Sequence, residues 1–170
     1  MILLSWNCRG LRNPSAFHDL CQLVKEKKPH FLFLMETKSV KNKMEAIRIK
    51  LGFTCLFVVD PVGRSGRLAF LWNDGSGVSI KNLSRRHIHV EVLYMAGTWL
   101  LTDFYGHPNP MKREEGWNLL QHLKDNSSSP WMCMGDFNEI VAHFEKWGAS
   151  LRRECQMKKF RDAITYCGVT

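Results

Sequence analysis

The chain has no apolar run that approaches the roughly 18 consecutive residues of a membrane-spanning helix. Its six cysteines form no C-x-x-C motif, and no histidine pair follows at zinc-finger spacing, which argues against a structural zinc site. The start, MILLSWNCRG, has no basic leader and too few apolar residues for a signal peptide. These absences predict a protein with free thiols in a reducing compartment, the nucleus or the cytoplasm, with no membrane partner.

Acidic residues are also in short supply. The 170 residues include 16 Asp and Glu against 24 Lys and Arg, so the net charge is +8. This balance favours a polyanionic partner, because each neutralised phosphate of a nucleic acid releases a counterion. Repeats, low-complexity segments and an interdomain linker are missing, and 45% of the residues are hydrophobic. The sequence therefore predicts one globular domain with a sizeable core.

Apolar runs alternate with amphipathic stretches along the chain. Runs typical of strands are ILLSW, HFLFLMETK, FTCLFVVD, RLAFLWN, GVSIKNL, IHVEVLYM, TWLLTDFYG and PWMCMG. Helical spacing predicts four helices: one opened by Pro14, one over 40–51 stopped by Gly52, one from about Pro110 to Lys124, and one around Glu154–Cys167. Helices that flank a block of consecutive strands predict an α+β layered sandwich and not a regular βαβ barrel.

One strand shows a clear alternation of side chains. In Ile88–Tyr94, Ile88, Val90 and Val92 share one face, and His89 and Glu91 share the other. This pattern predicts a strand whose second face meets water.

Polar side chains stand where three of the apolar runs end. Asn7 ends the first run, Glu36 ends HFLFLME, and Asp136 with Asn138 follows WMCMG. Each is compatible with ordinary turn chemistry, since Asn and Asp accept tight bends. Taken together, they predict that oxygen atoms gather at one rim of a sheet, where Mg²⁺ and a phosphate could bind.

The same residues lie in motifs that resemble a known family. The motifs SWNCRGL, METK, LTDFYGHP and GDFN, with Asn7, Glu36, Tyr105, Asp136 and Asn138, resemble the endonuclease/exonuclease/phosphatase superfamily. More narrowly, NCRGL has Arg9 where an acidic residue is usual, and it resembles the endonuclease domain of plant non-LTR (LINE-type) retrotransposons, which is close to the apurinic endonucleases. The resemblance covers essentially the whole chain.

The resemblance implies a four-layered α/β sandwich of two packed mixed sheets flanked by helices. It also implies Mg²⁺-dependent (or Mn²⁺-dependent) hydrolysis of a DNA phosphodiester, that is, a DNA-nicking endonuclease. Glu36 would hold the metal, with Asn7 as a further ligand or as an orienting neighbour. Asp136 would orient or deprotonate the attacking water, and Asn138 and Tyr105 would donate hydrogen bonds to the phosphate.

Residues that flank these motifs are candidates for binding the nucleic acid. They are Arg9, Lys38, Arg64 and Asn109. The alternative for the basic residues is an ordinary solvated charge, and Lys38 has a third possible role as an ion pair that orients Glu36. His107, in YGHP, is expected to be structural or to neighbour the phosphate, because the family has no catalytic histidine at that point.

The chain departs from the family pattern in two places. The family completes its site with a late aspartate and a C-terminal Asp-His pair, whereas this sequence ends at Thr170. We therefore expect residues 1–170 to form a single domain that lacks its last strands, incomplete at the C-terminus and weak or inactive alone. Arg67 stands where a glycine is usual, which predicts an altered loop or DNA contact.

Three further questions stay open at the level of sequence. A DNA-binding or Mg²⁺-binding remnant without catalysis is an alternative to the nuclease. A phosphatase of the same fold, acting on an inositol phosphate, a lipid or an RNA tail, is another, although the positive charge disfavours it. A reverse transcriptase domain in a longer polyprotein is a possible partner, and the oligomeric state is not indicated.

Overall fold

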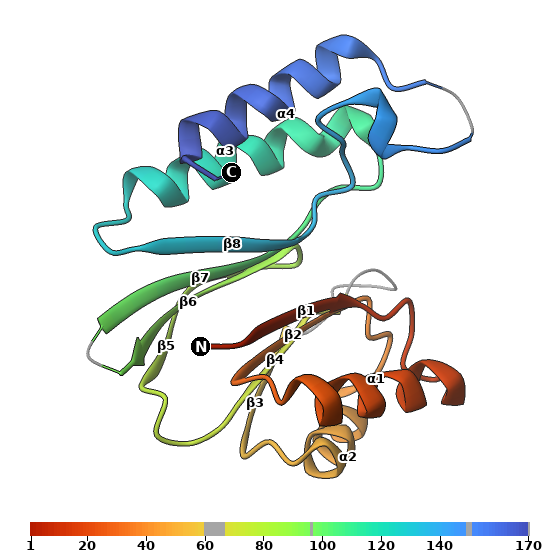
Figure 1. The fold of residues 1–170 in the computed structure, drawn as a ribbon, viewed down its shortest axis with the longest axis vertical. Helices are drawn as coiled ribbons and strands as arrows, with labels where there is room; N and C mark the ends of the chain where they lie inside the picture. Colours follow the sequence, from red (N-terminus) through yellow and green to blue (C-terminus); the bar gives the residue numbers. More distant parts are fainter. Residues whose placement is uncertain (60–66, 96, 149–150, 170) are drawn as a thin grey trace.

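The structure is a computed structural model that describes residues 1–59, 67–95, 97–148 and 151–169. Two four-stranded sheets pack face to face, and a pair of helices covers the outer face of each, so the molecule has four layers (Figure 1). This arrangement is the α/β sandwich that the resemblance implied.

The first sheet comes from the N-terminal half of the chain. Its strands, in spatial order, are β1 (Leu3–Asn7), β2 (Phe31–Met35), β4 (Ala69–Trp72) and β3 (Cys55–Val58). The helices over it are α1 (Pro14–Lys27) and α2 (Lys41–Leu51). The predicted helix limits are confirmed: the Asn13 side chain caps α1 by accepting from the Ser15 N–H, and Gly52 ends α2 at a φ of 81°.

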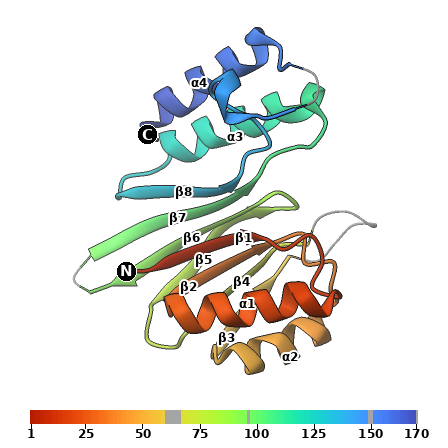
Figure 2. The same ribbon diagram turned by 45° about the vertical axis from the view of Figure 1, so that its right-hand side comes forward.

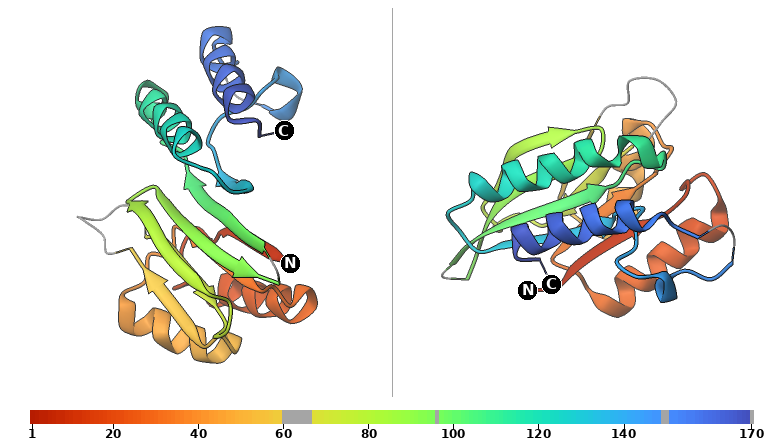
Figure 3. Two further views of the ribbon diagram at one scale, coloured as in Figure 1. Left: turned by 90° about the vertical axis from the view of Figure 1, so that its left-hand side faces the viewer. Right: turned by 90° about the horizontal axis from the view of Figure 1, so that it is seen from above.

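The second sheet follows in the order β5 (Val78–Ser84), β6 (His87–Tyr94), β7 (Gly97–Tyr105) and β8 (Trp131–Asp136). Over it lie α3 (Arg113–Asp125) and α4 (Glu154–Cys167), side by side when the molecule is seen from above (Figure 3). Two short 3₁₀ helices, η1 (Pro110–Lys112) and η2 (His143–Glu145), complete the described elements. The start predicted for the third helix thus belongs to η1.

Each sheet contains one pair of parallel strands. In the first sheet β1 runs parallel to β2, with Asn7 opposite Met35. In the second, β7 runs parallel to β8, with Tyr105 opposite Asp136. Parallel strands end at the same edge of a sheet, and β1 and β8 end on the same side of the molecule (Figure 2). Four strand ends therefore meet at one rim.

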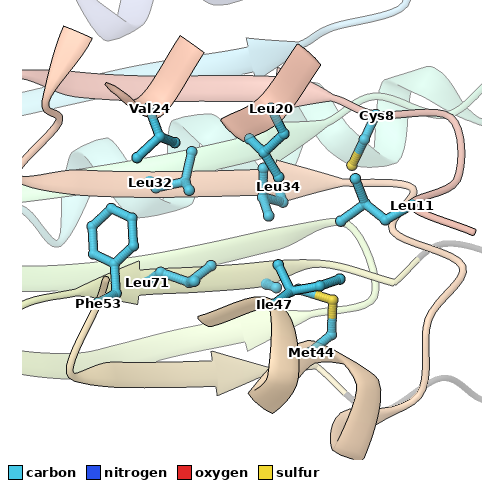
Figure 4. Close-up of a cluster of buried hydrophobic side chains, with 11 residues drawn as sticks. Cys8, Leu11, Leu20, Val24, Leu32, Leu34, Met44, Ile47, Phe53 and Leu71 are labelled. Atoms are coloured by element: carbon cyan, nitrogen blue, oxygen red, sulfur yellow. The ribbon is translucent and has the colours of Figure 1, made fainter. Parts of the chain in front are cut away.

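The core consists of three apolar layers between the four layers of secondary structure. Figure 4 shows the layer between the helices α1 and α2 and the first sheet. Side chains of both helices cover apolar side chains of the sheet in this layer, which includes Leu20, Val24, Met44, Ile47, Leu32, Leu34 and Leu71. The middle layer lies between the sheets, where the rings of Phe33 and Phe70 of the first sheet, stacked 4.2 Å apart, belong to one apolar cluster with Ile88, Val90 and Val92 of β6. The last layer packs α3 and α4 on the second sheet. Continuous burial of β2 on both faces explains why its sequence does not alternate.

The prediction of a solvated face on β6 is wrong for His89. Its side chain is buried, and its Nδ1 lies 2.7 Å from the Thr102 Oγ1, which also accepts from the Trp131 indole N–H at 2.8 Å. A polar side chain with a hydrogen-bond partner can be buried, and an alternating pattern does not reveal such partners.

All six cysteines are free thiols, as expected. Among the described helices, none has the length and apolar character needed to cross a membrane.

Candidate functional site

The rim where the two pairs of parallel strands end carries the polar residues singled out in the sequence. Asn7 is the last residue of β1 and Tyr105 the last of β7, while Asp136 ends β8. Glu36 follows β2 directly and turns away from the strand at a φ of 50°, in the left-handed region. The structure thus brings residues of both sheets to one place.

Asn7 joins two carboxylates. Its Nδ2 donates to the Glu36 Oε1 at 3.2 Å and to the Asp136 Oδ2 at 2.9 Å. The Asn7 Oδ1 accepts from the backbone N–H of Arg9 at 3.2 Å. A single amide therefore holds the carboxylates of both sheets within hydrogen-bond distance of one nitrogen atom, which fixes their orientation.

The Glu36 carboxylate is stabilised by its neighbours. Burial by itself raises the pKa of Glu36, but hydrogen bonds from Tyr105 and Asn7 and the positive charge of Lys38 outweigh burial and lower that pKa. The Tyr105 hydroxyl donates to Oε1 at 2.6 Å, and the Lys38 Nζ lies 3.7 Å from Oε2. Glu36 is therefore held in its ionised form.

Tyr105 stays a proton donor over the physiological range. Burial and the hydrogen bond to Glu36 raise the pKa of its hydroxyl to about 12. The Arg86 guanidinium lies over the ring, 5.7 Å from its centre. The one phenolic proton is given to Glu36 here, so donation to a phosphate requires that this bond open first.

The ends of β7 and β8 are locked to each other. The Gly106 N–H donates to the Asp136 carbonyl at 2.7 Å, and the Asn138 Nδ2 donates to the Gly106 carbonyl at 2.8 Å. The Asn138 N–H donates to the Asp136 Oδ1 at 3.0 Å. A Cβ on Gly106 would lie 1.9 Å from the Phe137 carbonyl oxygen, so this approach of the two loops requires glycine. One N–H of the Asn138 amide is left for a ligand.

A basic cavity of about 610 Å³ opens beside these residues. Glu36 and Tyr105 form one part of its wall. The cationic and ionisable residues of the remaining wall are Lys38, Arg85, Arg86, His107, Lys112 and Glu115. Positive charge next to a pair of carboxylates suits a phosphate, whose oxygens need cationic and N–H partners.

The candidates for nucleic-acid contact have different positions. Lys38 lines the cavity and is ion-paired with Glu36, the third role considered for it. Arg9 is exposed next to the site at a φ of 48°. Asn109 is exposed after β7, where its side chain accepts from the Met111 N–H. Arg64 lies outside the described residues.

Two other residues named from the sequence lie near the rim. His107 lines the cavity, and its Nδ1 accepts from the Asn109 N–H at 2.9 Å, which is a loop contact. The Arg67 carbonyl accepts from the Thr37 N–H at 3.1 Å, and its buried Nη1 has no hydrogen-bond partner among the described residues.

The residues at the rim fit a hard divalent cation held mainly by substrate and water. No group of three or more His, Cys, Asp and Glu side chains that could enclose a metal occurs in the described part of the chain. Mg²⁺ usually takes one or two carboxylates and keeps water or phosphate oxygens in its other positions. The Glu36 Oε2, whose neighbour among the described residues is the Lys38 ammonium at 3.7 Å, is the oxygen best placed for such a role.

Several residues of the site were not predicted from the sequence. Arg85 and Arg86 reach the cavity from the turn between β5 and β6, and the basic pair in LSRRH was the available signal. Glu139 was missed as well. Its buried carboxylate pairs with Arg113 at 2.6 Å and Arg152 at 3.0 Å, and it follows the GDFN motif directly.

Comparisons with known proteins bear on the family and the fold of the chain. A family model described as the endonuclease/exonuclease/phosphatase family matches residues 4–161. Among solved structures, an AP endonuclease from Archaeoglobus fulgidus is similar with a TM-score of 0.70 at 19% identity, over 95% of this chain and 69% of that one. The endonuclease domain of TRAS1, a telomere-specific non-LTR retrotransposon, has a TM-score of 0.67 at 14% identity, over 98% and 70%.

An AP endonuclease from Leishmania major, LMAP, is similar with a TM-score of 0.64 at 16% identity, over 98% of this chain and 66% of that one. The comparison with curated protein sequences gave no match. The chain spans between 66% and 70% of the length of these three structures. At such identities the likeness concerns the fold.

Proposed function

The chain belongs to the endonuclease/exonuclease/phosphatase family, and from this premise we propose that it is a Mg²⁺-dependent endonuclease that nicks DNA. The narrower assignment, to the retrotransposon type, rests on the NCRGL motif and on the fold shared with the TRAS1 domain. Activity on a phosphodiester would use the rim at the ends of β1, β2, β7 and β8.

One observation carries the proposal: the Asn7 amide donates to both Glu36 and Asp136. Turn chemistry alone accounts for each polar strand end separately, but it gives no reason for residues of two sheets to share hydrogen bonds. Holding two carboxylates close together is costly unless they serve a cation or a proton transfer. A site for hydrolysis supplies that reason.

Each residue has a distinct task in this proposal. Glu36 would hold the metal ion, which when bound neutralises charge on the phosphate and on the leaving oxygen. Asp136 would orient the attacking water and accept its proton, since each of its side-chain oxygens accepts only one protein hydrogen bond. Asn138 would donate its remaining N–H to a phosphate oxygen.

Asn7 and Tyr105 would act mainly by orientation. Asn7 keeps the two carboxylates at a fixed spacing, and Tyr105 keeps Glu36 ionised by donating its proton to Oε1. With a cation bound at Glu36, the Tyr105 hydroxyl would be free to donate to a phosphate oxygen.

The basic cavity supports DNA as the substrate. Arg85, Arg86 and Lys112 line it, and the chain carries a net charge of +8. Contacts to the sugar-phosphate backbone do not depend on base sequence, so these residues would position the duplex without selecting a target. A soluble phosphate ester would use few of these contacts.

We expect slow hydrolysis by this chain alone. The resemblance implies an Asp-His pair at the site, and no histidine of the described residues forms a hydrogen bond or an ion pair with an acidic side chain at the rim. Binding without catalysis is the second candidate, and the Lys38 ammonium beside the Glu36 Oε2 favours it, because it already neutralises the oxygen that would bind the metal.

A plasmid-nicking assay tests the proposal. Supercoiled plasmid is incubated with the chain in Mg²⁺ or in EDTA, and the Glu36→Gln and Asp136→Asn variants are compared with Glu26→Gln, which changes an exposed carboxylate on α1. We expect slow nicking that needs Mg²⁺, is lost in both site variants and persists in the control. Nicking that survives both variants, or faster turnover of soluble phosphate esters, would contradict the proposal.

A further inference from the structure

Two aromatic side chains are strongly exposed on the segment between β8 and α4. Trp147 is 96% exposed and Phe144 is 81% exposed. The chain has six tryptophans and ten phenylalanines, and in the described structure all the others are buried or half-buried. Large apolar side chains gathered at a surface mark a binding site more often than a defect of packing. We call Phe144 and Trp147 the aromatic pair.

The segment that carries the aromatic pair is fixed to the rim at both of its ends. Glu139, with a side chain 1% exposed, comes directly after Asn138, and Arg152 lies just before α4. Arg152 pairs with Glu139 at 3.0 Å and donates to the Asn138 carbonyl at 3.3 Å. The segment leaves β8 at the end of the molecule where β1 also ends (Figure 1). The segment that carries the aromatic pair is therefore anchored at Asn138 and Glu139, directly after the end of β8.

The surroundings of the aromatic pair are basic. Residues 143–148 and 151–153 contain Lys146, Arg152 and Arg153 against one acidic residue, Glu145. The Glu145 carboxylate is engaged locally, since its Oε2 accepts from the Val141 N–H at 2.9 Å. Arg152 is ion-paired with Glu139, but the segment as a whole has more cationic than acidic residues. Exposed rings on a segment of positive net charge match a polyanion that also offers flat apolar faces, and a nucleic acid has both.

We propose that Phe144 and Trp147 stack on unpaired nucleobases of a nucleic acid strand that passes the rim. The proposal rests on the proposed function for the identity of the polymer. Bases inside a duplex are stacked on each other and offer no free face, so the aromatic pair acts where the strand is single or opened. Stacking by the aromatic pair would give the protein a preference for unpaired DNA next to the cleaved bond, in addition to the backbone contacts that the cavity makes.

Fluorescence anisotropy with labelled DNA tests the stacking. A fluorescein-labelled 12-nucleotide single strand and the same strand in a blunt duplex are titrated with the full chain in EDTA, which keeps the DNA intact. The variants are Trp147→Ala, Trp147→Leu, Trp147→Phe and Phe144→Ala. Tyr166→Ala, which removes an exposed ring from α4, is the control.

We expect Trp147→Ala and Trp147→Leu to weaken single-strand binding by about tenfold, because stacking of one base has that order of effect. Trp147→Phe keeps a ring and retains most of the affinity, Phe144→Ala loses a similar factor, and duplex binding changes less than twofold. Equal losses on both DNAs, full binding by Trp147→Leu, or no single-strand binding by the wild type would overturn the proposal.

The outcome is separable from that of the proposed function. The single-strand titration is made in EDTA, where the DNA stays intact, so its result does not depend on whether the chain hydrolyses DNA. Stacking by Trp147 without Mg²⁺-dependent nicking would refute the nuclease and leave the stacking in place. Mg²⁺-dependent nicking by a chain whose single-strand binding does not change in Trp147→Ala would support the nuclease and refute the stacking.

Discussion

A carboxyl group buried beneath the site makes the stability of the protein depend on pH. Asp103 lies on β7 two residues before Tyr105, on the same face, and its side chain is fully buried. The Ser5 hydroxyl donates to its Oδ1 at 2.6 Å, whereas its Oδ2 has no hydrogen-bond partner in the described structure. Burial raises the pKa of Asp103 from 3.8 to about 7, although the Ser5 bond opposes the rise.

The sign of the effect follows from proton linkage. The folded protein keeps the Asp103 proton up to about pH 7, while the unfolded chain releases it near pH 3.8. The stability that this proton contributes is thus complete below pH 3.8 and is lost as the pH rises through about 7. At about 1.4 kcal/mol per pKa unit, the loss is about 4 kcal/mol, of which about 2.5 kcal/mol falls between pH 5 and pH 8.

The variant Asp103→Asn isolates this contribution. Asparagine accepts from Ser5 as the acid does, but it cannot ionise. We expect the free energy of unfolding of the wild type to fall by about 2.5 kcal/mol relative to Asp103→Asn between pH 5 and pH 8, measured by urea denaturation. Burial lowers the pKa of His87 to about 4 and also lowers the pKa of His89. Both histidines therefore make the folded protein less stable as the pH falls, and they do so equally in the wild type and in Asp103→Asn.

The control is Asp19→Asn, which removes an exposed carboxyl from α1. Its unfolding free energy should follow the wild type across the same pH range. Parallel curves for the wild type and Asp103→Asn would refute the reasoning, because they would mean that Asp103 is solvated or fully hydrogen-bonded in the folded protein.

Three further predictions concern the rim. Tyr105→Phe removes a hydrogen bond that lowers the pKa of Glu36. The pKa of Glu36, measured by an NMR titration of its carboxyl group, should therefore rise, and the acid limb of any nicking activity should move to higher pH. Gly106→Ala places a Cβ 1.9 Å from a backbone oxygen, so thermal unfolding should show a loss of more than about 2 kcal/mol, while an unchanged midpoint would contradict the described approach of the loops. Glu139→Gln leaves the buried Arg113 without its counter-charge and should cost about 3–5 kcal/mol in chemical denaturation; a cost below about 1 kcal/mol would show that water reaches the pair.

The order and type of the elements could be predicted because they depend on local patterns. Pro14 and Gly52 mark helix limits by their own backbone preferences, and the limits Glu154–Cys167 of the last helix agree with the structure. His89 shows where local patterns fail. Its burial depends on Thr102, which lies on the neighbouring strand and is invisible to an argument from alternation.

Part of the candidate site could be predicted for the same reason. Asn7, Glu36 and Asp136 stand out because each ends an apolar run, which is a property of a few adjacent residues. Arg86 and Glu139 do not stand out, because their roles depend on partners from other strands and helices: the ring of Tyr105 for one, Arg113 and Arg152 for the other. Such partners can be found only when the packing is known.

The sequence by itself determined the chemical groups of this protein and the strand ends that carry them. The spacing of apolar residues and the turn residues are local properties, and the net charge is a sum over residues, so none of them depends on the fold. Only the tertiary structure decided that one amide bridges carboxylates 29 and 129 positions away along the chain. It also decided that burial raises the pKa of Asp103 and that Trp147 is exposed to solvent. The physical reason is that burial and hydrogen bonding depend on which groups are close in space. Segments far apart in the sequence come close only when the two sheets pack together.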